Sequence, residues 1–536
     1  MTVGLVTLPS AAASSGDSTT YLNVSLDVTS KSGDVAVGGG KVFVSAEDRI
    51  VVADTTGKLT STITGLSGAL GLAASPDGTR LYAALSGSNE VAEINTASLD
   101  ITRRIDLTAY PCPSNLSLAD DRLWVGYGCP NTDGGGVLSL DLSVATAEPV
   151  AFGPNTNSAP IVAAAGDTLV FGDPGVAPTD LLVYDVSGTA PTQRGAIDGS
   201  EQDLSFVNDL AITPDGSMVI SSFGSPYHYD AWDTGSLAKV RTYGQEPSFD
   251  GYPLGVAISA DGAHIAGGRS RGSTDIAVYD TVTAAKTYTN TGPLGDLVEG
   301  SLAFSGADLF GVLREWRDGK IHLWRSEGAT LKASTLTLTT PGDSVISKPL
   351  TMSGRLTLAD ESAPGPQPLV VTRHPQYGTP AILPGVTTAA DGTFTITDIP
   401  SAYGGTTYDV RWDGDSVFRG SAASAFTWTR FAASLTLIGP AKGVIGKPLQ
   451  LNGVLDTNSG TIPGGISISV QRTLTGRDGT VTTTTLPAVT PGSDGSFGFT
   501  DTPDAAGRYA YTVRWEDTDY EPAQADHSVA VRTGRG

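Results

Sequence analysis

The side chains best suited to bind a ligand gather in short segments whose Gly, Pro, Ser and Asp content predicts loops between strands. Aromatic residues and arginines lie close together there, although the chain has a net charge of -23. Aromatic faces beside arginine can cradle a sugar ring or a loop of a protein partner. The alternative is that these side chains pack the loops against one another. The candidate ligand-binding residues are Tyr227, His228, Tyr229, Trp232, Arg269, Arg271, Arg314, Trp316 and Arg317.

A second kind of chemistry is indicated by polar residues at the start of short apolar runs. Asp34, Asn115, Asp209 and Ser301 occupy this position. Carboxylate and amide oxygens are the ligands that Ca²⁺ prefers, so a cation at Asn208 and Asp209 would support metal-dependent hydrolysis. The alternative is that these two side chains hydrogen-bond the local backbone where a strand begins. We therefore expect no resident cofactor, with Ca²⁺ as the cation to test.

No catalytic constellation stands out in the sequence. The five histidines are scattered along the chain, and no Gly-x-Ser-x-Gly motif lies between a predicted strand and a predicted helix. The glycine runs lack the lysine of a phosphate-binding loop. We assign no catalytic residue and expect a binding protein more than an enzyme.

A repeat over about the first 330 residues determines how these loops are placed. Its clearest copy is Leu72–Leu85 followed by Glu90–Asn95: an apolar run, a Gly/Asp turn, a second run, a loop and a third run. Each copy fits one four-stranded blade, so the sequence predicts a seven-bladed β-propeller over residues 21–333. The other six copies lie about 37 to 48 residues apart and begin near residues 34, 115, 161, 209, 255 and 301.

The blade pattern places the candidate residues on one face of the ring. The residue before each first strand lines the mouth of the central channel, where Asp34, Asn115, Asp209 and Ser301 would meet. The loops between the second and third strands share that face and carry the aromatic and arginine residues. Residues 21–28 alternate in polarity and are expected to supply the outer strand of the last blade, which closes the ring.

The chain has two cysteines, Cys112 and Cys129, and the blade pattern places both in loops on this same face. Their co-location favours a disulfide, which is common in exported proteins. Two free buried thiols are the alternative, because a zinc site would need further ligands at a suitable spacing.

A second repeat, with a period of about 100 residues, fills the rest of the chain. Residues 348–356 match residues 447–455, and Asp391–Asp398 matches Asp494–Asp501. Each copy has about seven short alternating strands, as a β-sandwich requires. The domains predicted from the two repeats are residues 21–333, 334–432 and 433–536.

Both repeats resemble known families. Ser75–Tyr82, with its Pro-Asp-Gly turn, resembles the YVTN-type β-propeller repeat of secreted bacterial surface proteins, and Thr213–Ile220 and Ser259–Ile265 are looser copies. Four of the blades lack this turn. The tandem sandwiches look like bacterial Ig-like repeats, which form stalks on exported proteins. This resemblance implies a binding or scaffolding role. Val207–Gly216 is similar to the Asn-Asp segment of gluconolactonase-type propellers, where such residues hold a divalent cation.

The N-terminus and the composition indicate an exported protein. Val3–Leu8 is apolar and is followed by small residues, as in the tail of a secretory signal peptide, and a disordered extension is the alternative for residues 1–20. No apolar run of about 18 residues follows, so we expect no membrane span.

The net charge of -23 disfavours nucleic acid as a partner.

The sequence therefore predicts an all-β protein, with a seven-bladed propeller followed by two Ig-like sandwiches, that is secreted or held at the cell surface. Its loop face would bind a cell-surface glycan or a secreted protein, and the sandwiches would act as a spacer. Two alternatives stay open: a metal-dependent lactonase- or lyase-like enzyme, and a structural subunit of a secreted or surface assembly.

Overall fold

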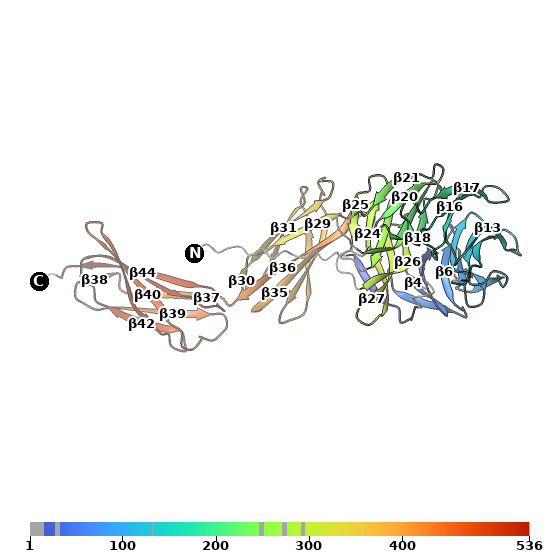
Figure 1. Cartoon of the computed structure of the whole chain (residues 1–536). Coiled ribbons are helices and arrows are strands. Elements are labelled where there is room, and N and C mark those ends of the chain that lie inside the picture. The colour runs from blue at the N-terminus through green and yellow to red at the C-terminus, as the bar shows by residue number, and fades with distance from the viewer. Residues whose placement is uncertain are drawn as a thin grey trace. The chain divides into compact units, whose positions relative to one another are not determined.

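Every regular element of the structure is a β-strand, which confirms the predicted all-β fold class (Figure 1). The strands form two compact units, the ring unit (residues 16–334 and 414–420) and the sandwich unit (residues 335–413 and 421–534). Within the described residues, a search for a helix that could span a membrane found none. The computed structural model describes residues 16–26, 33–130, 132–245, 251–270, 276–290 and 295–534.

Within these residues, seven four-stranded antiparallel sheets make up the ring unit. In six of them, four consecutive strands pair in chain order, because a short turn returns each strand beside the one before it. Their strands are β2 (Val35–Gly38), β3 (Lys41–Ala46), β4 (Arg49–Asp54), β5 (Leu59–Thr64); β6 (Ala69–Ala74), β7 (Arg80–Leu85), β8 (Glu90–Asn95), β9 (Ile101–Asp106); β10 (Asn115–Ala119), β11 (Arg122–Tyr127), β12 (Gly135–Asp141), β13 (Val150–Thr156); β14 (Ile161–Ala165), β15 (Thr168–Gly172), β16 (Leu181–Asp185), β17 (Thr192–Ile197); β18 (Ser205–Ile212), β19 (Met218–Ser225), β20 (Tyr229–Asp233), β21 (Lys239–Tyr243); and β22 (Tyr252–Ile258), β23 (His264–Ser270), β24 (Ile276–Asp280), β25 (Lys286–Thr289).

The seventh sheet joins both ends of the ring unit. It contains β26 (Gly295–Ser305), β27 (Asp308–Glu315) and β28 (Ile321–Ser326), and its outer strand is β1 (Asp17–Tyr21). This confirms that an N-terminal strand completes the last sheet. The strand was expected at residues 21–28, but it covers Asp17–Tyr21. The apolar residues that follow β1, Leu22 and Leu26, are instead buried in a hydrophobic cluster with residues of the first and last sheets.

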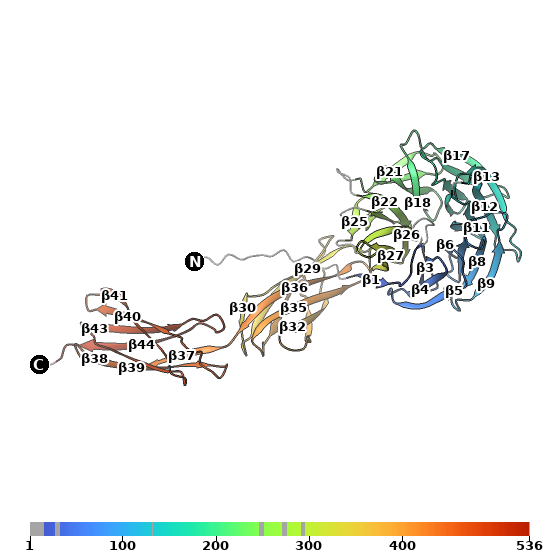
Figure 2. The same cartoon turned by 60° about the horizontal axis from the view of Figure 1, so that its bottom comes forward.

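The first strands of the sheets contact one another in a closed cycle. β2, β6, β10, β14, β18, β22 and β26 each contact the next, and β26 contacts β2 again. Figure 2 shows the resulting ring of sheets. The cycle brings the starts of the first strands together around one axis, which is where the sequence places its polar residues.

Tight turns at the Pro-Asp-Gly segments hold first and second strands together. The Asp77 carboxylate accepts hydrogen bonds from the Ser75 hydroxyl at 2.6 Å and from the Thr79 N–H at 3.0 Å. Gly78 has φ 68°, a conformation that glycine adopts without a steric penalty. Asp215 and Asp261 accept equivalent bonds from Thr213 and Ser259 in two later sheets. The repeated motif is thus a self-capping hairpin turn.

The sandwich unit holds two copies of one eight-stranded arrangement, each with a three-stranded and a five-stranded sheet in the same strand order. The sequence predicted about seven strands per copy, and the additional strand is a three-residue segment that pairs in parallel with the last strand. In the first copy, the three-stranded sheet contains β29 (Ser334–Thr339), β31 (Leu350–Leu358) and β34 (Thr393–Asp398). The five-stranded sheet contains β30 (Asp343–Val345), β36 (Arg419–Arg430), β35 (Gly404–Gly414), β32 (Pro368–Pro375) and β33 (Ala381–Thr387). In the second copy, the three-stranded sheet contains β37 (Ala433–Ile438), β39 (Leu449–Thr457) and β42 (Ser496–Asp501). The five-stranded sheet contains β38 (Lys442–Val444), β44 (Ala523–Arg532), β43 (Gly507–Trp515), β40 (Ile468–Gly476) and β41 (Val481–Val489).

Each sandwich repeats the same buried polar triad. The Tyr408 hydroxyl donates to Asp398 at 2.6 Å, and Tyr511 donates to Asp501 at 2.7 Å. An arginine pairs with the same carboxylate in each copy, as the 3.0 Å bond of Arg472 to Asp501 illustrates. A buried carboxylate needs such partners, because an isolated one is expensive to desolvate.

The predicted disulfide is present. Cys112 and Cys129 are bonded, with their Cα atoms 5.1 Å apart. They lie just before β10 and just after β11, on the side of the ring where the first strands begin. The bond therefore ties two loops of that face to each other.

We expect the double substitution Cys112→Ser and Cys129→Ser to destabilise the ring unit by about 3 kcal/mol, because the bond closes a loop over a separation of 17 residues. Denaturant unfolding, with and without a reductant, measures the loss. The reductant should lower the stability of the natural chain and leave that of the double variant unchanged. An equal response of both proteins would contradict the expectation.

Candidate functional site

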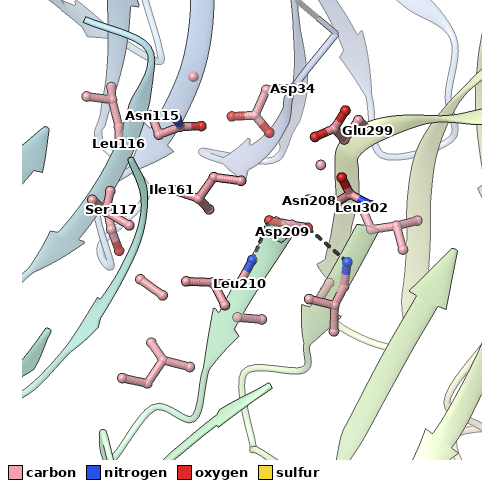
Figure 3. A pocket seen from close by; sticks show the side chains of 18 of the residues that line it. Asp34, Asn115, Leu116, Ser117, Ile161, Asn208, Asp209, Leu210, Glu299 and Leu302 are labelled. Carbon is pink, nitrogen blue, oxygen red and sulfur yellow. Dashed lines mark hydrogen bonds between the residues drawn. The ribbon is translucent and has the colours of Figure 1, made fainter. Parts of the chain in front are cut away.

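A cavity of about 270 Å³ opens where the first strands of the sheets begin (Figure 3). Residues from all seven first strands or from the segments that lead into them line it. Apolar residues such as Ile161 and Leu302 form part of the wall. The polar side chains among the lining residues are Asp34, Asn115, Ser117, Asn208, Asp209 and Glu299.

Asp34 links the first sheet to the second. Its Oδ1 accepts the Val35 N–H at 2.7 Å, and its Oδ2 accepts the Leu72 N–H of β6 at 2.7 Å. Burial raises the pKa of the Asp34 carboxyl to about 7, although the two N–H groups act in the opposite direction. The residue keeps some contact with the cavity, but protein surrounds its carboxyl group. The protonation of Asp34 therefore changes near neutral pH.

Asp209 repeats this geometry between the fifth and sixth sheets. Its Oδ1 accepts the Leu210 N–H and its Oδ2 accepts the Val256 N–H of β22, both at 2.9 Å (Figure 3). Each carboxylate thus links two neighbouring first strands, which belong to different sheets and form no ladder with each other.

Two asparagines of the cavity also bridge neighbouring sheets. The Asn115 Nδ2 donates to the Pro160 carbonyl at 3.0 Å, and the Asn208 Nδ2 donates to the Pro253 carbonyl at 2.7 Å. Proline lacks an N–H, but its carbonyl still needs a donor where water is scarce. These bonds agree with the alternative that Asn208 and Asp209 hold the start of a strand.

The side chains at the cavity do not form the donor set of a divalent cation. No group of three or more His, Cys, Asp or Glu among the described residues is placed to hold a metal ion. Both oxygens of Asp34 and both oxygens of Asp209 already accept backbone N–H groups. These bonds give both carboxylates a structural role as links between neighbouring sheets.

Ser301, expected at the channel mouth, lies elsewhere. It is fully buried, and its hydroxyl donates to the Val298 carbonyl at 2.6 Å and accepts the Val312 N–H at 3.2 Å. Glu299 lines the cavity instead. The cause is an irregularity in β26, whose pairing with β27 shifts register between Leu297 and Leu302. The repeat was aligned without this irregularity, so the prediction placed Ser301 at the channel mouth in the position that Glu299 occupies.

Three of the candidate ligand-binding residues are core residues. Tyr229, Trp232 and Arg269 are 0%, 1% and 4% exposed. The Tyr229 hydroxyl donates to the Gly268 carbonyl at 2.8 Å, and the Arg269 guanidinium lies 5.7 Å from the centre of the Tyr229 ring. Tyr229 and Trp232 were assigned to a loop, but both belong to β20, a buried inner strand. The prediction of a solvent-facing role was wrong for these three.

The other candidates divide between a packed and an exposed group. The Nε2 atom of His228 lies 3.4 Å from Oδ2 of the buried Asp230. Trp316 is 57% exposed in the turn between β27 and β28, where Arg317 is also exposed and Arg314 is half-buried. Arg271 lies outside the described residues.

Three aromatic side chains lie at or next to the ends of β18, β19 and β22, on the side of the ring where the first strands begin, and the sequence interpretation found only one of them. Tyr227 is 45% exposed and meets Tyr252 edge to face, with ring centres 5.5 Å apart. Phe206 is 55% exposed and lies on β18, two residues before the cavity residue Asn208. Ser205 pairs with Ser225, so Phe206 and Tyr227 lie at the same end of their sheet. We call Phe206, Tyr227 and Tyr252 the aromatic rim.

Solved structures with a similar fold share little sequence with this chain. The Cps50 (Swd1) β-propeller domain of Myceliophteria thermophila matches with a TM-score of 0.44 and 14% identity, over 57% of this chain and 99% of that domain. Hydrazine synthase of Kuenenia stuttgartiensis matches with a TM-score of 0.43 and 15% identity, over 56% and 96% of the two chains. Hsv2 of Kluyveromyces lactis matches with a TM-score of 0.38 and 12% identity, over 55% and 98%. No protein-family model matches the sequence, and a search of curated proteins gave no match.

Asp34 should make the stability of the ring unit depend on pH. Its pKa in the folded protein, about 7, lies above the ordinary value of 3.8 for an aspartate. The stability contributed by the protonated group is therefore complete below about pH 4 and is lost as the pH rises through 7. We expect the natural chain to lose up to about 4 kcal/mol relative to Asp34→Asn between pH 4 and pH 8. Denaturant unfolding of both proteins at each pH measures this difference, and a constant difference would contradict it.

Tyr229→Ala should destabilise the ring unit by about 3 to 5 kcal/mol, because it removes a fully buried ring and leaves the Gly268 carbonyl without a donor. Tyr227→Ala, two residues away but exposed, should change the unfolding free energy by less than about 1 kcal/mol. Thermal melts of the two variants provide the comparison. Similar melting temperatures would mean that Tyr229 does not act as a core residue.

Proposed function

We propose that this protein is an exported binding protein whose ring unit, a seven-bladed β-propeller of the YVTN type, recognises a glycan through the aromatic rim and the adjoining cavity. The two sandwiches are proposed to be Ig-like domains that serve as a spacer. The closed cycle of seven four-stranded sheets supports the propeller assignment. The disulfide supports export, because such bonds persist in oxidising compartments.

The observation that carries the proposal is Phe206. Its large apolar side chain is 55% exposed, and its backbone has φ 57°, in the left-handed region that bulky residues avoid. Exposure and backbone strain both oppose phenylalanine at this position, and glycine would satisfy the backbone better. Strain of this kind persists at sites that bind or react, where the side chain is needed. A flat aromatic surface held beside a cavity is suited to stacking against a sugar ring.

The cavity next to the rim supplies the polar part of such a site. Its side chains offer carboxylate and amide oxygens and amide N–H groups, which match the hydroxyl groups of a sugar. A volume of about 270 Å³ accommodates one sugar residue of a longer chain. Trp316, with Arg314 and Arg317, provides a second exposed aromatic surface in the last sheet.

Binding is favoured over catalysis by the chemistry of the two cavity aspartates. Asp34 and Asp209 accept two backbone N–H groups each, and this structural role accounts for both carboxylates without a metal-dependent lactonase or lyase reaction. A protein loop could also rest on the aromatic rim. We favour the glycan because the polar cavity opens on the same side of the ring unit as these aromatic side chains.

The test is a glycan-array screen of the full chain, followed by affinity measurements on variants for the best ligand. We expect Phe206→Gly and Tyr227→Ala each to weaken binding by about tenfold or more, the loss seen for a stacked aromatic anchor. Phe206→Gly should at the same time preserve or raise the melting temperature, because glycine relieves the left-handed backbone.

Tyr377→Ala is the matched control, since Tyr377 is 65% exposed but lies in the sandwich unit. It should leave glycan affinity unchanged. An array without hits would reject the glycan proposal, and so would a ligand whose affinity is the same for the natural chain and for Phe206→Gly.

A further inference from the structure

A different binding site is indicated at one end of the five-stranded sheet of the second sandwich. A depression of about 580 Å³ lies there between β40, β43 and β44. Three arginines line it, Arg477, Arg508 and Arg532, and none of the lining residues is an aspartate or a glutamate. We call this depression the arginine pocket. The chain has 33 Lys and Arg residues and 56 Asp and Glu residues. A depression lined by three arginines and by no acidic residue is therefore unusual for its composition.

The strand register explains why the three side chains converge. Arg508 of β43 lies opposite Ala530 of β44 on one side and opposite Thr475 of β40 on the other. Arg532 follows Ala530 by two residues and therefore points to the same face of the sheet. Side chains in this diagonal relation have Cβ atoms about 7 to 8 Å apart, within reach of two long arginines. Arg477 follows β40 directly, in the turn that leads to β41, and is also among the lining residues.

The three guanidinium groups are exposed and unneutralised. Within the described residues, Arg477, Arg508 and Arg532 form no side-chain hydrogen bond and no ion pair with a carboxylate. Arg472, on the opposite face of β40, shows the usual situation, because it pairs with Asp501 at 3.0 Å. Like charges placed close together repel one another, so this arrangement is destabilising until an anion enters.

The floor of the arginine pocket leaves room for a ligand. Ala530 presents only a methyl group there, and the hydroxyls of Thr475 and Ser528 add hydrogen-bond donors at its edge. Guanidinium groups bind phosphoryl oxygens through two parallel N–H bonds, and a tetrahedral phosphoryl group presents oxygens to several donors at once. A carboxylate has only two oxygens and would leave one arginine without a partner.

We infer that the arginine pocket binds a phosphoryl group, either as free phosphate or as part of a small phosphorylated ligand. A single phosphoryl group fits three arginines, whereas a long nucleic-acid strand would meet the strongly negative remainder of the chain. This inference is independent of the glycan site on the ring unit, because the two sites share no residue.

The test measures binding of inorganic phosphate, and separately of a sugar phosphate, to the full chain by calorimetry at low ionic strength. We expect Arg508→Gln and Arg532→Gln each to weaken binding of both probes by about tenfold, and the triple variant with Arg477→Gln to abolish it. Tighter binding of the sugar phosphate than of inorganic phosphate would identify a phosphorylated ligand, and equal binding would identify free phosphate. Arg514→Gln is the matched control, because Arg514 is exposed on the same face of β43 but lies outside the pocket.

Three results would overturn the inference. The first is equal binding by the natural chain and the triple variant. The second is an equal loss of affinity in Arg514→Gln, which would mean that only the general charge of the sheet matters. The third is much tighter binding of a single-stranded oligothymidylate than of either small probe, which would make the ligand a nucleic acid.

Discussion

The pairing of β1 with β28 is the interaction on which the ring unit depends. It joins residues near the start of the unit to its last sheet, and the Tyr288 hydroxyl reinforces it with a 2.6 Å bond to Asp17 across 271 residues of chain. Without β1, the last sheet would present an unpaired edge. The cavity is built from the first strands of all the sheets, so it exists only in the closed ring. The site is therefore coupled to a contact that lies far from it in the sequence.

Inside the closed ring, polar side chains complete the contacts that strands alone cannot make. The first strands diverge around the axis, and Asp34, Asn115, Asn208 and Asp209 reach across to backbone groups of the next sheet. The polar residues at the channel mouth are therefore explained by their structural role, since they link neighbouring sheets. Phe206 has no such explanation, because its exposure and its left-handed backbone are both unfavourable.

Features that repeat regularly along the sequence were predicted correctly, and residues near an interruption of the repeat were misplaced. The repeat of apolar runs and turns was sufficient for the all-β class, for completion of the last sheet by an N-terminal strand and for the disulfide. The irregular pairing in β26 displaced the expected position of Ser301 and concealed Glu299. Tyr229 and Trp232 were misplaced because a strand of five residues, β20, was too short to distinguish from its loop. The exposure of Phe206 depends on a backbone angle, for which its residue type gives no signal.

The two sandwiches have the same strand order and the same Tyr-Asp-Arg triad, displaced by about one hundred residues of chain. A unit that carries its own core and its own buried polar pair can be copied in tandem without redesign of its neighbours. Duplication followed by divergence would then explain how the arginine pocket arose in one copy alone: the copied fold stayed intact, while three surface positions were free to change.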